Sequence, residues 1–235
     1  MKIEVLFGEI CNFYGDPKNA EYLEKTLPDA ELIRTPLIGT PYFADHRPDM
    51  ILMGAMSEST QRRVIDVLRP YTDRIRALID DGVVFLMTGN AYEVFTKHIT
   101  YVTEEIETDA LGLFDLTVKT DLFRRYNGKV LGTCAGLTVT GFRSQFSRVY
   151  GDNSAEAFLT VERGAGINEE SRLEGVRRNN FFGTHLLGPI LPLNPEFCEY
   201  LISLCGVTAR AAFRDAAMEA YARRVMEFRD PATRF

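Results

Sequence analysis

The stretch VVFLMTGNAYEVF, residues 83–95, carries the strongest fold signal in the chain. Five apolar residues, Val83–Met87, run directly into Thr88, Gly89 and Asn90, and a helix-like segment follows. A continuous apolar run of this length is typical of a strand that is covered on both faces. Many α/β enzymes hold a nucleophile where a buried strand turns sharply into a helix. The stretch therefore predicts a buried strand with a candidate site at its end, and Thr88 is expected at the tip of the turn.

The N-terminal part of the chain repeats this alternation of strand and helix. Glycine and proline punctuate the segments, and Pro70 is expected to kink or split the longest helix. Alternation of this kind implies a parallel sheet with helices on both faces. The expected strands are Ile3–Phe7, Ala30–Thr35 and Met50–Gly54, and the expected helices are Ala20–Thr26 and Glu58–Asp81.

The middle of the chain has a different pattern. Between Ile99 and Val161, short β-like runs are separated by glycines and by the dipeptide Asn127-Gly128, which predicts antiparallel hairpins added to the sheet. A last strand and a proline-rich turn are expected within Asn179–Pro195. Two helices are expected to close the chain, at Pro195–Cys205 and Arg210–Arg229. Since no segment has linker composition, we expect residues 1–235 to form a single domain.

Composition narrows the function classes. The 235 residues are 46% hydrophobic and 26% charged, with a net charge of −6, which argues against a nucleic-acid partner. No apolar run is long enough for a membrane span, and the N-terminus is too acidic for a signal peptide. The four cysteines form no C-x-x-C pair and no zinc spacing, so we expect reduced thiols in a cytoplasmic protein, with no metal and no cofactor.

Four turns qualify as parts of a ligand site. In an open α/β sheet, ligands bind at the carboxyl ends of the strands, and each of these turns follows an expected strand. The topology is expected to bring them to one edge of the sheet. The turns are Asn12–Asn19, Gly54–Glu58, Thr88–Asn90 and Thr184–Asn194.

Motifs in these turns, and one in the middle hairpins, resemble those of the CobB/CobQ-like class I glutamine amidotransferases. Similarity is greatest to the GatD branch, the glutaminase subunits of lipid II isoglutaminyl synthase. The family segments are Asn-x-Tyr-x-Asp, Gly-Gly-Gly-Ser-x-x-x-Gln, Ile-Cys-Gly-Gly-Tyr-Gln, Gly-Phe-Glu-Asn-His, and Leu-His-Gly-Pro followed by Ile-Leu-Pro and Asn. The corresponding stretches are NFYGDPKN (12–19), ILMGAMSESTQ (51–61), FLMTGNAYE (85–93), GFRSQFSRVY (141–150) and GTHLLGPILPLN (183–194).

The resemblance implies a flavodoxin-like three-layer α/β sandwich, with a mostly parallel sheet and an antiparallel extension. It also implies a reaction. In the family a cysteine thiolate attacks the side-chain amide of glutamine, a histidine transfers the protons, and glycine amides stabilise the oxyanion. An acidic residue of the first turn orients the histidine in the GatD branch, and an arginine of the middle hairpins helps to bind glutamine.

Residue by residue, this chain departs from the catalytic pattern. Thr88 is matched with the cysteine and Leu187 with the histidine. Of the three glycines after the third strand, the second and third are replaced by Ala55 and Met56, and Asn90 replaces the glycine after Gly89. The residues that keep the pattern are Asp16, Gly54, Ser57, Gly89 and, for the arginine, Arg125 or its neighbour Arg124.

Three functional hypotheses follow. The first is a protein that has lost glutaminase activity and binds a partner or a small amide or amino-acid ligand at the old site. The second is an active amidotransferase subunit that supplies ammonia to a Mur-ligase-like (MurT-type) synthetase in peptidoglycan or cobalamin-type amidation. The third is a hydrolase with a rearranged site. In it, His185, which shares a strand face with Leu187, would act as the general base. A packed, structural histidine is the alternative interpretation of His185.

Overall fold

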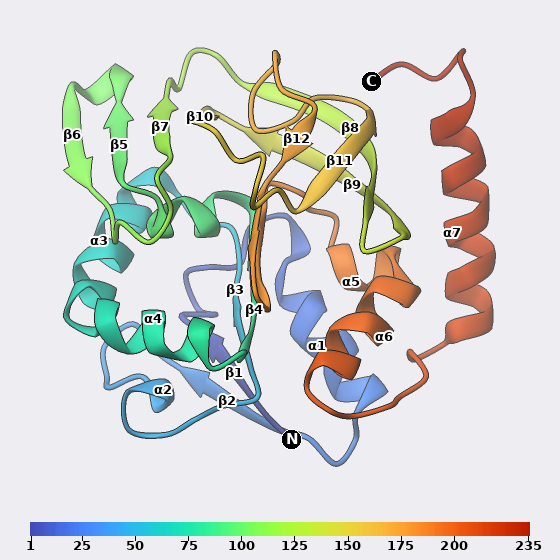
Figure 1. The fold of residues 1–235 in the computed structure, drawn as a ribbon, viewed down its shortest axis with the longest axis horizontal. Helices are drawn as coiled ribbons and strands as arrows, with labels where there is room; N and C mark the ends of the chain where they lie inside the picture. Colours follow the sequence, from blue (N-terminus) through green and yellow to red (C-terminus); the bar gives the residue numbers. More distant parts are fainter.

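The computed structural model describes all residues, 1–235, and is built around a six-stranded sheet (Figure 1). The strand order is β13-β14-β4-β3-β1-β2, and every pair is parallel except β13 with β14. The expected parallel α/β core is confirmed. The strands are β1 (Lys2–Leu6), β2 (Glu31–Thr35), β3 (Met50–Met53), β4 (Val84–Thr88), β13 (Val176–Arg178) and β14 (Phe181–Thr184).

Helices cover both faces of this sheet, as Figure 1 shows. Helices α3 and α4 lie on one side of β3 and β4, and α1, α5 and α6 lie on the other. The predicted break at Pro70 is confirmed, because a short 3₁₀ turn there separates α3 from α4. The helices are α1 (Pro17–Thr26), α2 (Tyr42–Asp45), α3 (Glu58–Leu68), α4 (Thr72–Asp80), α5 (Ile190–Leu193), α6 (Pro195–Leu204) and α7 (Arg214–Arg229), with 3₁₀ segments η1 (Phe13–Gly15), η2 (Arg69–Tyr71), η3 (Gly89–Phe95) and η4 (Val102–Glu104).

The sheet separates two apolar cores, and β4 contributes to both. Successive strand residues point to opposite faces, so Phe85 and Met87 pack with α3 and α4, whereas Val84 and Leu86 pack with α1 and α6. We call these sides the α3 face and the α1 face. Because Thr88 follows Met87 at the end of the same strand, this alternation directs its side chain to the α1 face.

The middle of the chain differs from the prediction. Its hairpins form two separate four-stranded sheets, β10-β7-β5-β6 and β12-β11-β8-β9, and only β13 adds an antiparallel strand to the main sheet. Asn127-Gly128 lies inside β8, and the hairpin turn is at Ala135-Gly136, where both φ angles are positive. These strands are β5 (His98–Tyr101), β6 (Ile106–Asp109), β7 (Thr117–Thr120), β8 (Tyr126–Cys134), β9 (Leu137–Gln145), β10 (Ser147–Tyr150), β11 (Leu159–Arg163) and β12 (Leu173–Glu174).

The segment after β4 is also not the α-helix expected of a strand-to-helix elbow. It is the 3₁₀ helix η3. The carbonyl groups of Val94 and Phe95 accept hydrogen bonds from the amides of Leu111 and Leu113, at 3.0 Å each. Because these carbonyls are used by a distant loop, the helix stops after its first turns.

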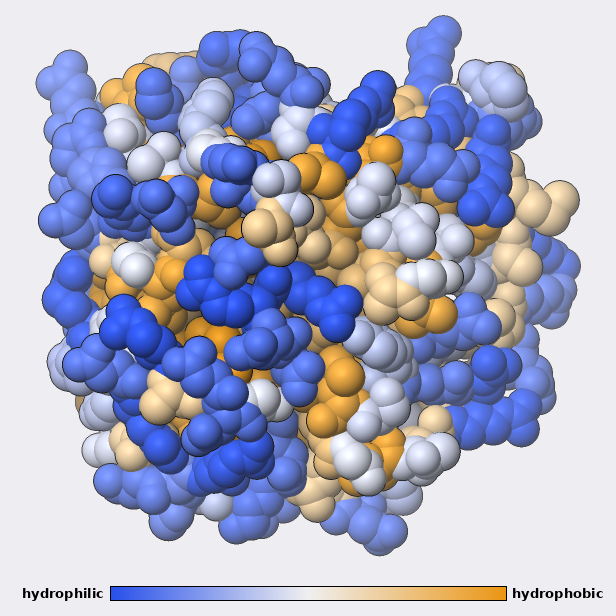
Figure 2. Space-filling model, viewed as in Figure 1, coloured by the Kyte–Doolittle hydropathy of each residue, from blue (hydrophilic) through white to orange (hydrophobic).

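The surface combines polar and apolar side chains. On the face drawn in Figure 2, hydrophilic side chains predominate around the edge, and apolar atoms are visible in scattered patches between them. None of the helices combines the length and apolar character that a bilayer crossing requires.

Candidate functional site

The four turns identified in the sequence meet at the carboxyl edge of the main sheet. The amide of Phe13 in the first turn donates to the carbonyl of Ala55 in the third-strand turn, at 3.1 Å. The side chain of Asn19 accepts a 2.9 Å hydrogen bond from the amide of Leu191, which links the first turn to the proline segment. A site at this edge is therefore assembled from segments far apart in the sequence.

Gly54 is required where the first turn touches the turn that follows β3. A Cβ atom at this position would lie 2.7 Å from the carbonyl oxygen of Cys11 and 2.8 Å from the Cβ of Asp16. Cβ atoms are essentially never found this close to a non-bonded atom, so no residue other than glycine fits here. This close approach lets the Ala55 amide donate a 2.6 Å hydrogen bond to Oδ2 of Asp16.

The tip of the turn after β4 is Gly89, and not Thr88 as predicted. Thr88 has the extended backbone of a strand residue, with φ −106°, whereas Gly89 has φ +62°, a conformation that favours glycine. A Cβ atom at Gly89 would lie 2.5 Å from the Cβ of Ala55 and 3.1 Å from Cδ2 of Leu187. A side chain that faces Ala55 and Leu187 would therefore have to come from position 89.

Thr88 instead lines a cavity of about 440 Å³ on the α1 face, together with Asp16. Its hydroxyl lies 3.5 Å from the carbonyl oxygen of Met53, a long hydrogen bond. Burial raises the pKa of Asp16 to about 6, although the Ala55 amide and the Thr88 side chain favour the charged carboxylate. The cavity thus contains a buried carboxyl group that exchanges its proton near neutral pH.

Cys11, which no sequence motif singled out, lines the same cavity. Burial, reinforced by the negative charges of Glu9 and Asp16, raises the pKa of its thiol to about 12. Since the thiolate is the nucleophilic form, this cysteine is not an activated replacement for the family nucleophile.

The side of the elbow that faces Leu187 is nearly filled. Ala55, Gly89, Asn90, His185 and Leu187 line a cavity of only about 60 Å³. The Asn90 side chain closes it from within, because its Oδ1 accepts a 3.0 Å hydrogen bond from the amide of Met56 and its Nδ2 donates a 2.9 Å bond to the Met56 carbonyl. Two successive amides of the third-strand turn, those of Ala55 and Met56, are therefore bound by side chains of the chain itself.

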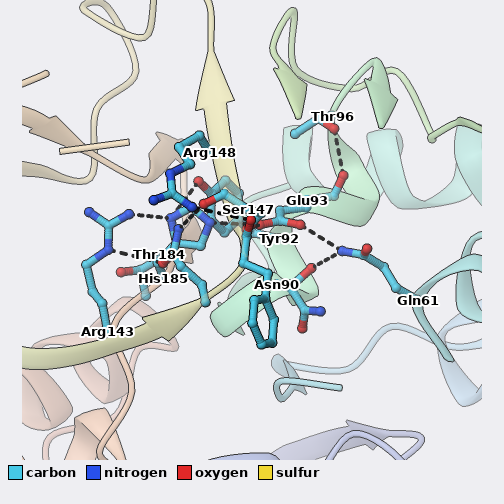
Figure 3. Close-up of polar contacts among 12 residues, drawn as sticks. Gln61, Asn90, Tyr92, Glu93, Thr96, Arg143, Ser147, Arg148, Thr184 and His185 are labelled. Atoms are coloured by element: carbon cyan, nitrogen blue, oxygen red, sulfur yellow. Dashed lines mark hydrogen bonds and ion pairs between the residues drawn. The ribbon is translucent and has the colours of Figure 1, made fainter. Parts of the chain in front are cut away.

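His185 belongs to a buried polar network, drawn in Figure 3, of which His185, Glu93 and Ser147 also line this small cavity. Its Nε2 lies 2.8 Å from Oε1 of Glu93, and its Nδ1 lies 3.2 Å from both Nη2 of Arg143 and the hydroxyl of Tyr92. Ser147 also donates to Oε1 of Glu93. Glu93 is fully buried, and its other oxygen accepts a 2.9 Å hydrogen bond from Gln61.

The protonation states fit this arrangement. Burial, reinforced by the Arg143 charge, lowers the pKa of His185 well below its usual value, so the ring is neutral. A neutral ring whose Nδ1 accepts from Arg143 carries its proton on Nε2, which then donates to Glu93. Burial raises the pKa of Glu93 to about 7, against the opposing effect of its hydrogen bonds from Ser147 and Gln61. Both ring nitrogens of His185 are thus engaged, and Thr88 lines a different cavity.

Glu93 is the site residue that the sequence interpretation missed. Its signal was present, because a glutamate in the middle of AYEVF, within an otherwise apolar segment, is placed where burial demands hydrogen-bond partners.

Arg125 lies at the mouth of the small cavity. It donates to the hydroxyl of Tyr14 at 2.8 Å and to Oγ of Ser144 at 3.1 Å, and its guanidinium lies 5.3 Å from the centre of the Phe146 ring. Tyr14, Ser144 and Phe146 all line that cavity, so the Arg125 side chain contacts its wall. No group of three or more His, Cys, Asp or Glu side chains converges in a way that would hold a metal ion.

Comparison with known proteins agrees with the fold and the motifs. The CobB/CobQ-like glutamine amidotransferase domain matches residues 2–195. Over 155 residues, 66% of this chain, the sequence is 29% identical to subunit GatD of lipid II isoglutaminyl synthase (glutamine-hydrolyzing) from Staphylococcus aureus (strain N315). That match spans 62% of the Staphylococcus aureus protein, less than two thirds of its length.

Two further relatives extend the match. The GatD subunit from Streptococcus pneumoniae (strain ATCC BAA-255 / R6) is 25% identical over 209 residues, which cover 86% of this chain and 79% of that protein. A crystal structure of a glutamine amidotransferase superposes with a TM-score of 0.57 at 15% identity, covering 87% of this chain and 99% of the other, and supports the fold alone. The match over residues 2–195 shows that the chain belongs to the CobB/CobQ-like glutamine amidotransferase family.

Proposed function

We propose that this chain is a GatD-like subunit that no longer hydrolyses glutamine and acts by binding. The observation that carries the proposal is the occupation of the third-strand turn: the amides of Ala55 and Met56 donate to Asp16 and Asn90. An oxyanion is stabilised by donors aimed at an empty position, and donors that already have partners cannot serve a substrate without breaking those bonds.

The geometry of the elbow supports the same proposal and shifts one residue assignment. If the Tyr-Gln of the family segment Ile-Cys-Gly-Gly-Tyr-Gln is matched with Tyr92 and Glu93, the cysteine falls on Gly89. We infer that Gly89 stands at the nucleophile position, since only a side chain there would face Leu187, the residue matched with the catalytic histidine. A glycine and a leucine offer neither a nucleophile nor a base.

Two rival functions make different demands. An active amidotransferase would need the network at Asn90 to open and another residue to attack. A hydrolase that uses His185 would need the ring to accept a proton, although Glu93 and Arg143 already engage both of its nitrogens. The neutral ring is the one feature that favours this second rival, because a neutral histidine is the basic form.

An ammonia-release assay with glutamine separates these possibilities. We expect the purified chain to release no ammonia above background, alone or co-expressed with a MurT-type synthetase. Glutamine-dependent release that Thr88→Ala abolishes would overturn the proposal in favour of an amidotransferase that uses Thr88. Turnover that survives Thr88→Ala but is lost in His185→Ala would instead establish the rearranged hydrolase.

The partner is tested separately. The relatives are named as subunits of a glutamine-hydrolysing synthase, and we propose that this chain also assembles with a Mur-ligase-like synthetase in peptidoglycan or cobalamin-type amidation. Co-expression followed by size-exclusion chromatography is expected to give one co-eluting complex. Separate elution of two folded proteins at micromolar concentration would contradict the partner assignment and would leave the activity result unaffected.

A further inference from the structure

The cavity beside Thr88 is unexplained by glutamine chemistry. It lies on the α1 face, behind the elbow, and shares no lining residue with the small cavity at Gly89 and Leu187. Its volume, about 440 Å³, falls in the range of small-molecule sites, roughly 300–1,000 Å³. It also lies at the carboxyl ends of β1 to β4, where open α/β sheets bind their ligands.

The charges around this cavity are unbalanced. Four charged residues line it, and two of them have ion-pair partners: Glu21 with Lys18 at 2.6 Å and Arg34 with Glu24 at 2.8 Å. The other two are Glu9, which accepts the amide of Leu37 at 2.7 Å, and Asp16. Neither Glu9 nor Asp16 forms an ion pair with a basic side chain.

Asp16 is the more informative of the two because it is only 4% exposed. A buried carboxylate is costly unless a cation or several hydrogen bonds compensate it, and Asp16 has the Ala55 amide, the neighbouring Thr88 side chain and a weaker contact to Asn19 at 3.3 Å. Next to it, Thr88 is 2% exposed, and its hydroxyl oxygen accepts no hydrogen bond. Two buried polar side chains on the cavity wall thus retain unused capacity to accept hydrogen bonds.

Part of the remaining wall is apolar. Val5, Leu52 and Leu86 line the cavity along the strands of the α1 face. A bare metal ion would leave this wall without a partner, whereas an organic ligand would cover it.

We propose that this cavity binds a small organic ammonium ion, a primary amine with an unbranched apolar body. The ammonium group donates to the carboxylate of Asp16 and to the hydroxyl of Thr88, and the hydrocarbon packs on Val5, Leu52 and Leu86. The inference goes beyond the proposed function, since it holds whether or not the chain hydrolyses glutamine.

The test uses a matched pair of probes on the full chain. Pentylammonium and 1-pentanol have the same length, but only the first carries a charge. Titrations followed by amide chemical shifts are expected to show the amine bound at Leu52, Gly54 and Thr88, with an affinity at least about tenfold above that of the alcohol.

Variants locate the site. Asp16→Asn keeps an acceptor for the Ala55 amide but removes the charge, and is expected to weaken amine binding at least about tenfold. Leu52→Phe is expected to fill the cavity and abolish binding of both probes. Glu21→Gln is the matched control, because Glu21 lines the cavity but already pairs with Lys18, and less than about a threefold change is expected there.

Several results would overturn the proposal: no binding at roughly 10 mM amine, equal binding of amine and alcohol, or unchanged amine binding by folded Asp16→Asn. If Asp16→Asn does not fold, amine binding is measured on Thr88→Val and Leu52→Phe instead. Unchanged binding by both variants would show that the amine does not bind in this cavity. None of these outcomes bears on the ammonia-release assay, so the two proposals fail independently.

Discussion

The two cavities on either side of the turn after β4 differ in volume and in how far their polar side chains are hydrogen-bonded. Three of the four turns border both cavities, whereas Thr184–Asn194 borders only the smaller one; the cavity on the α1 face measures about 440 Å³ and the one at Leu187 about 60 Å³. On the first side, Asp16 and Thr88 face open space. On the second, Asn90, Glu93 and His185 are engaged by other residues of the chain.

This difference teaches how a site is closed without loss of the fold. The small side is filled by short methyl-bearing side chains in front, Ala55 and Leu187, and by a hydrogen-bonded network behind them. Each group in that network satisfies another, which is what a buried polar cluster requires. The strands and turns of the family fold need not move when the space between them is occupied.

The largest expected effect tests the closed side. Glu93→Ala removes the acceptor shared by Gln61, Ser147 and His185, so we expect a loss of about 3–5 kcal/mol in the free energy of unfolding. Urea denaturation followed by circular dichroism measures it. Glu58→Ala is the control: Glu58 lines the same cavity but accepts no side-chain hydrogen bond, and a loss above about 1 kcal/mol there would make the comparison uninformative.

The second prediction adds atoms to each side. Gly89→Ala places a methyl group at positive φ against Ala55 and should cost about 2–3 kcal/mol. Ala20→Leu directs its extra atoms toward the large cavity and should cost less than about 1 kcal/mol. Equal losses in thermal or urea unfolding would show that the two sides are packed alike.

The third prediction concerns pH. The pKa of Asp16 is raised to about 6 in the folded protein, so the folded state binds this proton more tightly than the unfolded state does. Its contribution to stability is therefore greatest at low pH and is lost as the pH rises through 6. Between about pH 5 and pH 8, wild type should lose about 1.4 kcal/mol relative to Asp16→Asn. A difference between the two proteins that does not change with pH, or that changes with the opposite sign, would contradict the assigned pKa.

The smallest effect is expected at the mouth of the closed side. Arg125→Ala loses contacts to Tyr14, Ser144 and Phe146, but the arginine is exposed, so the loss should be about 0.5–1 kcal/mol. Arg124→Ala is the matched control and should change stability by less than about 0.5 kcal/mol. A larger loss of stability in Arg124→Ala than in Arg125→Ala would show that Arg124, and not Arg125, makes the contacts at the mouth of the small cavity.

Much of the fold was accessible from the sequence because its signals are local. Apolar runs specify the buried strands, and Pro70 specifies the break between α3 and α4. The site was predicted less completely because it depends on register. Thr88 and Gly89 are adjacent, but a shift of one residue exchanges the faces of the sheet, and no local pattern distinguishes them. Glu93 was missed because its role comes from partners on α3, β10 and the segment after β14.

The hydrogen bonds between Asn90 and Met56 have a further consequence. The group that Asn90 presents to the turn is a carboxamide, the same group that ends the side chain of glutamine. It is covalently tethered, so its effective concentration is on the order of millimolar or higher, whatever the composition of the surroundings. A free amide would have to displace an internal competitor that never diffuses away. The elbow in this chain is therefore better described as occupied by an amide group of the chain itself than as empty.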